Sequence, residues 1–197
     1  MAPYFETAKS FADVPITDEG VDTASFLVSS TDFVNMFGLL GSGVFAFVQA
    51  DLKSNIGGVR SRYEATSDRS TTLEKLVLYE AERHECHGTA CLVRLIRGLL
   101  FACQALQNMQ NDDSSELHIC FKRSYDTNLR HHHSFIVRSA VSVAIRAVPH
   151  RRDFYIRLTQ GGSHEKFDAE LTKWLAGLET IVMRMKAFLE NGGYGRV

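Results

Sequence analysis

The sequence predicts an all-α protein that folds as a single domain of about seven or eight helices. Apolar residues recur three to four positions apart through most of the chain, which is the spacing of one helix face. Only three of the 197 residues are prolines, so long stretches remain uninterrupted for helices. No segment shows an extended alternation of apolar and polar residues, which is the pattern typical of strands. A chain of this length is sufficient for one hydrophobic core.

The first residues differ from the rest of the chain because they include Pro15 and Gly20 and carry few large apolar side chains. We therefore expect residues 1–22 to form a loosely tied arm, with one short helix around residues 4–11. Helical spacing of apolar residues starts after this arm, so the domain is expected to span residues 23–197.

Within the domain, polar or glycine-containing stretches separate the helical segments. The clearest pattern belongs to the last helix, which Gly192 and Gly193 are expected to end. The predicted helices span residues 23–40, 44–63, 71–79, 89–109, 117–125, 128–147, 153–158 and 164–190, and the glycines at 41–43 break the first from the second.

Local signals set several of these boundaries. Thr71 and Glu74 have the spacing of a capping box, which places the start of the third helix. The chain is expected to turn or kink around Gly88, and Asp113 or Ser114 is expected to cap the helix after the next loop. The helix over residues 89–109 carries a core stripe formed by Leu92, Leu95, Ile96, Leu99, Cys103 and Leu106, with Arg94, Arg97 and Phe101 on the opposite side.

Asp51 and Asn55 lie four residues apart in the second predicted helix. Their side chains therefore share one face, with about 5–6 Å between the Cβ atoms. Aspartate offers only acceptors, whereas asparagine offers donors and acceptors, so the pair suits a ligand with hydroxyls or an amide N–H. From spacing alone, a solvated helix face is the more common origin of such a pair.

Four short motifs add information that spacing does not give. They are LLGS at residues 39–42, ADLKSNI at 50–56, LVRLIRGLLF at 92–101 and HHHSFIV at 131–137. Together they resemble the glycolipid transfer protein family over about residues 26–189 and are most similar to fungal members of the heterokaryon-incompatibility type. The resemblance implies a two-layer helical sandwich that shields the acyl and sphingoid chains of one sphingolipid and carries it between membranes, without enzymatic chemistry.

The resemblance also assigns roles to individual residues. In glycolipid-selective members, an aspartate and an asparagine matching Asp51 and Asn55 hold the sugar and the ceramide amide, and a histidine matching His133 completes the grip on the amide. The carboxylate accepts from the amide N–H, and an imidazole N–H donates to its carbonyl. Without the resemblance, His133 is equally well explained as a surface histidine or a satisfied buried one.

The headgroup positions depart from the glycolipid pattern. Arg94 stands where those members have a tryptophan that stacks on the first sugar, and Gly58 stands where they usually have a lysine. Members specific for ceramide-1-phosphate have an arginine at the Arg94 position, but also an arginine and a lysine at the positions of Ala90 and Asn55. Because a guanidinium can donate two parallel hydrogen bonds to phosphate or sulfate, we expect, by a small margin, an anionic headgroup contacted by Asn55 and Arg94.

Three further positions are candidates for headgroup contact. Gly58 is one, by its place in the family pattern, and Arg97 is another, with an ion-pair role as its alternative. Tyr194 is the third, because the tail GGYGRV resembles the tyrosine and terminal valine of animal members, whose tail closes over the site.

Transfer requires contact with a membrane and room for the lipid chains. Phe135 matches an aromatic residue near the membrane-docking surface of the family. Basic residues that would attract an anionic leaflet are Arg130, Arg138, Arg146, Arg151 and Arg152, although a solvated basic face explains them equally well. Residues expected to line the lipid chains are Phe33, Phe37, Phe45, Phe101 and Phe121, for each of which an ordinary closed core is the competing interpretation.

Composition excludes several other classes of function. A net charge of −1 gives no indication of nucleic-acid binding, and no apolar run reaches the roughly 18 residues of a membrane span. The N-terminus lacks the layout of a signal peptide, so we expect a cytoplasmic protein that meets membrane surfaces transiently, with its four cysteines as free thiols.

Catalytic and metal-binding motifs are also missing from the sequence. No nucleotide-binding, hydrolase or metalloprotease motif occurs, and the histidines and cysteines lack zinc-ligand spacing, so we expect neither an enzyme nor a bound metal or other cofactor. The alternative function is a sphingolipid sensor or scaffold of the same fold that transfers no lipid in the cell.

Overall fold

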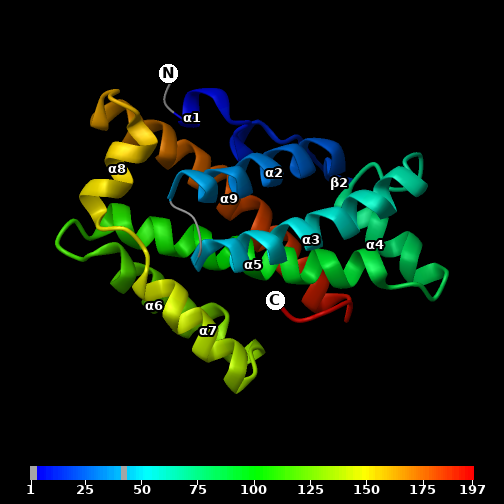
Figure 1. The fold of residues 1–197 in the computed structure, drawn as a ribbon. Helices are drawn as coiled ribbons and strands as arrows, with labels where there is room; N and C mark the ends of the chain where they lie inside the picture. Colours follow the sequence, from blue (N-terminus) through cyan, green and yellow to red (C-terminus); the bar gives the residue numbers. More distant parts are fainter. Residues whose placement is uncertain (1–3, 41–43) are drawn as a thin grey trace.

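A computed structural model of the chain describes residues 4–40 and 44–197 (Figure 1). Its regular structure is almost entirely helical, which confirms the predicted all-α fold. The elements before the first long helix are α1 (Tyr4–Thr7), the 3-10 turn η1 (Phe11–Asp13) and the antiparallel strands β1 (Ile16–Thr17) and β2 (Gly20–Val21). Eight longer helices follow in the described residues: α2 (Thr23–Leu40), α3 (Val44–Ala65), α4 (Leu73–Glu82), α5 (His87–Asn111), α6 (Leu117–Asn128), α7 (Phe135–Arg146), α8 (Arg151–Thr159) and α9 (His164–Asn191).

α5 lies at the centre of the fold and contacts α3, α4, α6 and α9. Because α3 also contacts α2 and α7, a layer built around α3 packs on a layer built around α5. α5 is long and apolar enough to cross a membrane, but 67% of that stretch is buried inside the fold, as in the core helix of a folded domain. Its predicted core stripe is buried at every position, namely Leu92, Leu95, Ile96, Leu99, Cys103 and Leu106.

The segment before α2 packs against α9. The Phe11 ring is 1% exposed and meets Trp174 of α9 edge-on, with 4.8 Å between ring centroids. Gly177 permits this approach, because a Cβ at that position would lie 2.3 Å from the Ala12 backbone nitrogen. This part of the arm therefore belongs to the core, and the expectation that it is loosely tied is wrong.

The predicted capping box of Thr71 and Glu74 is also wrong. Thr72, one residue later, caps α4 by accepting a hydrogen bond from the Lys75 backbone N–H at 3.2 Å. The backbone is still extended at Thr72, where it pairs with the chain just before α2, so the helix cannot start earlier. Glu74 instead accepts a hydrogen bond from the backbone N–H of Val21 at 2.8 Å.

The start of α6 differs from the prediction as well. Neither Asp113 nor Ser114 caps the helix, which begins only at Leu117. The side chain of Asp112 organises the loop instead, accepting from the hydroxyls of Ser114 and Ser115 at 2.6 Å each. These two bonds occupy the local donors and leave the helix to start after the loop.

The predicted continuous helix over residues 128–147 is interrupted. α6 ends at Asn128, the 3-10 turn η2 (Arg130–His132) follows, and His133 has an extended backbone with φ −104° and ψ 138°. Ser134 then caps α7 by accepting from the Val137 N–H at 3.5 Å. The interruption places His133 at the junction between α6 and α7.

The turns predicted at glycines are confirmed at the end of α9 but displaced near Gly88. The turn expected at Gly88 lies earlier, at residues 83–86, where His84 adopts a positive φ of 58°. α9 ends at the predicted glycines, and Gly193 adopts the φ of 72° typical of a helix C-terminus. The break predicted at residues 41–43 lies outside the described residues.

Candidate functional site

The first half of α3 presents a carboxylate that is held by a neighbouring amide. Asn55 donates through Nδ2 to the Asp51 carbonyl at 2.9 Å and to the Asp51 carboxylate at 3.3 Å. Asn55 is only 4% exposed, whereas Asp51 is exposed on the helix surface. The amide therefore orients the carboxylate from below, and the remaining acceptor positions of Asp51 point outward.

His133 lies close enough to Asp51 for the two charges to interact. Burial lowers the pKa of His133, the Asp51 carboxylate partly opposes this, and Arg138 and Arg97 act in the same direction as burial. The Tyr125 hydroxyl lies 3.2 Å from His133 Nδ1. When the hydroxyl donates to Nδ1, the neutral imidazole carries its proton on Nε2 and has one N–H to donate to a ligand.

Aromatic side chains from α5 and α6 lie next to Tyr125. Phe101 meets Phe121 edge-on at 5.8 Å between centroids and Tyr125 at 6.3 Å. His133 therefore stands beside a cluster of rings that belongs to the hydrophobic core or packs against it. Phe33 of α2 instead packs on Trp174 of α9, with 5.3 Å between ring centroids. Both residues are distant in sequence from the ring cluster. The side chains of Phe37 and Phe45 lie outside the described residues.

Arg94 stands exposed on α5. It forms no ion pair with any residue in ranges 4–40 and 44–197, although its charge acts on Cys91 and Arg97. Its five donors are therefore available to a bound group.

Gly58 contributes packing rather than a side chain. A Cβ at Gly58 would lie 2.3 Å from the Cys91 sulfur, so α3 and α5 approach too closely for a larger residue. The same seam is tight at Gly98, where a Cβ would lie 2.9 Å from the Leu52 side chain. The headgroup lysine of the glycolipid pattern has no room in this seam as it stands.

Arg97 and Tyr194 are both engaged elsewhere. Arg97 donates through Nε to the carbonyl of Arg196 at 2.7 Å, and its Nη2 donates to the same oxygen. Tyr194 stacks on Phe188 of α9, with 5.5 Å between centroids. In this structure both residues belong to the attachment of the tail, defined here as residues 194–197.

The first turn and outer face of α7 form an exposed apolar surface. Phe135 is 82% exposed and Ile136 is 80% exposed, and Val143 follows on the same helix at 58%. Of these three residues the family resemblance indicates only Phe135, although Ile136 and Val143 are spaced seven residues apart, as on one helix face. We call Phe135, Ile136 and Val143 the α7 surface.

Arg151 is not part of a basic membrane surface. Its guanidinium donates to the carbonyls of Met109 at 2.8 Å, Asp112 at 2.6 Å and Ser115 at 2.7 Å, so it closes the loop between α5 and α6. The other candidates are exposed, and Arg130 pairs with Asp126 at 3.3 Å.

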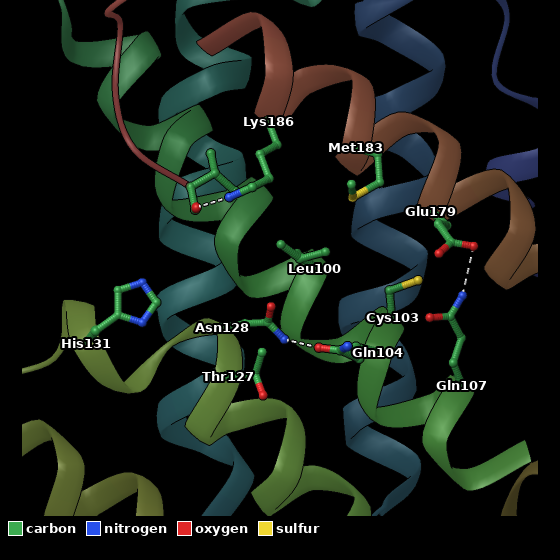
Figure 2. Close-up of a pocket in the computed structure, with 11 residues that line it drawn as sticks. Leu100, Cys103, Gln104, Gln107, Thr127, Asn128, His131, Glu179, Met183 and Lys186 are labelled. Atoms are coloured by element: carbon green, nitrogen blue, oxygen red, sulfur yellow. Dashed lines mark hydrogen bonds between the residues drawn. The ribbon is translucent and has the colours of Figure 1, made fainter. Parts of the chain in front are cut away.

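A cavity of about 310 Å³ opens on another side of α5, between α6, α9 and the tail (Figure 2). Its amide side chains mostly bond to one another or to a neighbour, as Gln107 does to Glu179 at 3.0 Å. None of Asp51, Asn55, Arg94 and His133 lines this cavity, so it is separate from the candidate site.

Comparisons with known proteins show which family the chain resembles. Residues 21–160 match the model of the family described as "Glycolipid transfer protein (GLTP)". The chain is 36% identical over 189 residues to a glycolipid transfer protein of Aureobasidium melanogenum, covering 95% of this chain and 93% of the relative.

Solved structures show the same similarity. The fungal glycolipid transfer protein HET-C2 is 38% identical, with a TM-score of 0.90 over 95% of this chain and 96% of that one. Human ceramide-1-phosphate transfer protein, bound to 12:0 ceramide-1-phosphate, shares the fold with a TM-score of 0.87 over 98% of each chain at 18% identity. The chain therefore belongs to the glycolipid transfer protein family.

Proposed function

We propose that the protein binds one sphingolipid and transfers it between membranes without changing it chemically. The observation that carries this proposal is the exposed carboxylate of Asp51, held by the buried amide of Asn55, together with His133 beside the ring cluster of Phe101, Phe121 and Tyr125. A secondary amide needs both partners, because its N–H donates and its carbonyl accepts. Glycolipid and ceramide-1-phosphate transfer by proteins of this fold supports the same function.

Each residue of the site then has a separate task. Asp51 accepts from the ceramide N–H, and His133 donates to the ceramide carbonyl. Asn55, the residue expected to contact the headgroup, acts chiefly by orienting Asp51, because its own side chain is buried under the carboxylate. Arg94 contacts the headgroup and favours phosphate or sulfate over an uncharged sugar, because its guanidinium is exposed and able to form charge-assisted hydrogen bonds.

The α7 surface serves as the contact with the membrane. Phe135 and Ile136 stand at the start of α7, two and three residues after His133, so their insertion brings the ceramide grip to the lipid. Exposed aromatic and aliphatic side chains in such a position gain free energy when they enter the boundary of a bilayer. We propose that the protein works from the cytoplasm and meets membranes transiently.

The test is transfer of fluorescent lipids between vesicles. Donor vesicles carry matched galactosylceramide, sulfatide or ceramide-1-phosphate, and phosphatidic acid serves as the control without a sphingoid chain. Transfer of sphingolipids but not of phosphatidic acid is expected, with the two anionic sphingolipids preferred. Binding of sphingolipid without transfer would contradict the proposal and indicate a sensor or scaffold.

A further inference from the structure

Arg97 is a half-buried cation with a neutral partner. Both of its bonded nitrogens donate to one acceptor, the backbone carbonyl of Arg196, and Nε does so at 2.7 Å. In the part of the chain that the structure describes, Arg97 forms no ion pair with a carboxylate. Burial and the nearby charge of Arg94 lower the pKa of its guanidinium. Its positive charge is therefore not balanced within the fold.

The tail is held across α5 by a small number of contacts. Gly195 lies on Val93, so closely that a Cβ at Gly195 would be 2.6 Å from a methyl group of that valine. The Val197 backbone N–H donates to Glu190 at 3.0 Å, and Lys186 of α9 donates to the Val197 oxygen. These contacts and Arg97 together keep the tail on the turn of α5 that carries Arg94.

Arg97 also lies within electrostatic reach of the ceramide grip. It follows Arg94 by three residues on α5, so the two side chains are neighbours on the helix surface. The positive charge of Arg97 also acts on His133, whose pKa it lowers in the same direction as burial does. A headgroup held above Asp51 and His133 would therefore meet two arginines if the tail did not occupy one.

We propose that Arg97 is a second headgroup residue that the tail holds in reserve, and that a sphingolipid with a phosphate or sulfate headgroup displaces the Arg196 carbonyl from it. This inference rests on the proposed function. Charged oxygens are stronger acceptors for a guanidinium than a backbone carbonyl is, so an anionic headgroup competes with the tail for Arg97. An uncharged sugar does not, and the tail then stays on α5.

Thermodynamic linkage gives the proposal its test. If binding of an anionic headgroup shifts the tail toward release by some factor, then release of the tail by mutation must raise the affinity for that headgroup by the same factor. The tail is released in two independent ways, by deleting residues 194–197 and by Gly195→Val, whose side chain collides with Val93. Each variant is prepared with Arg97 intact and with Arg97→Gln. Thermal unfolding identifies the variants that remain folded.

Binding of ceramide-1-phosphate, sulfatide and galactosylceramide is measured at equilibrium with fluorescent lipids. We expect tail release to raise the preference for the two anionic lipids over galactosylceramide about tenfold, and Arg97→Gln to abolish that gain. Lys186→Gln, which removes one hold on Val197, should give a smaller gain in the same direction. Lys173→Gln is the matched control on α9, because Lys173 pairs only with Glu170 among the described residues and should give no gain.

Hydrogen exchange reports the tail directly. Addition of ceramide-1-phosphate to the full chain should accelerate exchange of the Val197 amide, which is bonded to Glu190, whereas galactosylceramide should not. The Gly192 amide, which precedes the tail, is an internal reference, because it bonds to the Phe188 carbonyl at the end of α9. Equal acceleration by both lipids would overturn the inference.

Two further results would also overturn it. One is an unchanged lipid preference after tail release, and the other is a gain that persists with Arg97→Gln. Inorganic phosphate and phosphatidic acid separate the sources of the anion, and competition by either as strong as that by ceramide-1-phosphate would contradict a sphingolipid-specific site. Absence of sphingolipid transfer by the full chain would instead contradict the proposed function, so the two failures are distinguishable.

Discussion

The two ends of the seam between α3 and α5 use a carboxylate in opposite ways. At one end, Glu80 of α4 is 2% exposed and accepts from the backbone N–H groups of Gly88 and Thr89 at 2.9 and 2.7 Å. The Thr89 hydroxyl also donates to it at 2.7 Å, and Arg62 of α3 lies 3.3 Å away. Glu80 therefore caps the first turn of α5 and joins it to α3 and α4.

At the other end, Asp51 is exposed, and among the described residues its carboxylate accepts a side-chain hydrogen bond only from Asn55. The nearby donor, His133, lies across a gap that the side chains do not close with a hydrogen bond in the described structure. A carboxylate with all its partners inside the protein stabilises the fold, whereas one that is oriented but incompletely bonded is ready for a ligand. Glu80 and Asp51 therefore carry the same chemical group, but their partners give them different roles.

The largest effect is expected at the internal end. Glu80→Ala should lower the free energy of unfolding by about 3 kcal/mol or more, because it leaves Arg62 and the N–H groups at the start of α5 without their buried acceptor. Urea denaturation measures this difference. Glu82→Ala, at an exposed position of the same helix, is the control and should change stability by less than about 0.5 kcal/mol. Equal effects at the two positions would contradict a capping role for Glu80.

The outward end should behave in the opposite way. Asp51→Asn should leave stability within about 0.5 kcal/mol but lower sphingolipid transfer by roughly tenfold to a hundredfold, because the charged acceptor for the amide N–H is lost. Vesicle transfer and urea denaturation are measured on the same samples. Asp68→Asn, at an exposed position in the loop after α3, controls for the loss of one negative charge. A loss of transfer explained wholly by unfolding would show that Asp51 is structural.

The sequence indicates candidate residues for the outward end and none for the internal one. Asp51, Asn55 and His133 were singled out because a family resemblance adds to their spacing, and the long helices were identified by apolar periodicity. Neither signal reveals which partner a polar residue finds in space. Glu80 and Arg151 make their bonds to backbone groups that local sequence does not identify.

The differences from the predicted structure have both distant and local origins. Thr71 fits a capping box, but pairing with the chain before α2 keeps the backbone extended one residue further. The interruption at His133 was missed because apolar spacing continues across it, while Ser134 supplies a new cap. Gly58 is a headgroup candidate by the resemblance alone, and only the approach of Cys91 shows that it also permits the close packing of α3 on α5. At Thr71 and Gly58 a contact distant in sequence decides the local structure, whereas at His133 the local cap of Ser134 does so.

Arg94 tests the outward end at the position expected to contact the headgroup. Arg94→Ala should lower the preference for ceramide-1-phosphate over galactosylceramide about tenfold, or about 1.4 kcal/mol, because charge-assisted bonds to the phosphate are lost. Equilibrium binding of the two fluorescent lipids gives this ratio. Arg152→Ala, at an exposed position of α8, is the matched control. Unchanged binding and preference in Arg94→Ala would remove Arg94 from the site.

The smallest effect is expected on the pH dependence of stability, at His132, a partly buried residue next to His133. Its Nε2 is buried without a hydrogen-bond partner in the described structure, and burial together with the charges of Arg97 and His131 lowers its pKa from 6.5 to about 4. Between these values the unfolded chain binds a proton that the folded protein does not, so stability falls as the pH drops below 6.5. His132→Gln removes this titration and should reduce the loss of stability between pH 7 and pH 5 by about 1 kcal/mol, less than the full shift implies because the ring is only partly buried.

Urea denaturation at the two pH values measures the difference, so any constant effect of the substitution cancels. His118→Gln on the exposed side of α6 should lose stability as the parent protein does, and the same loss in His132→Gln would mean that His132 is protonated freely in the folded state.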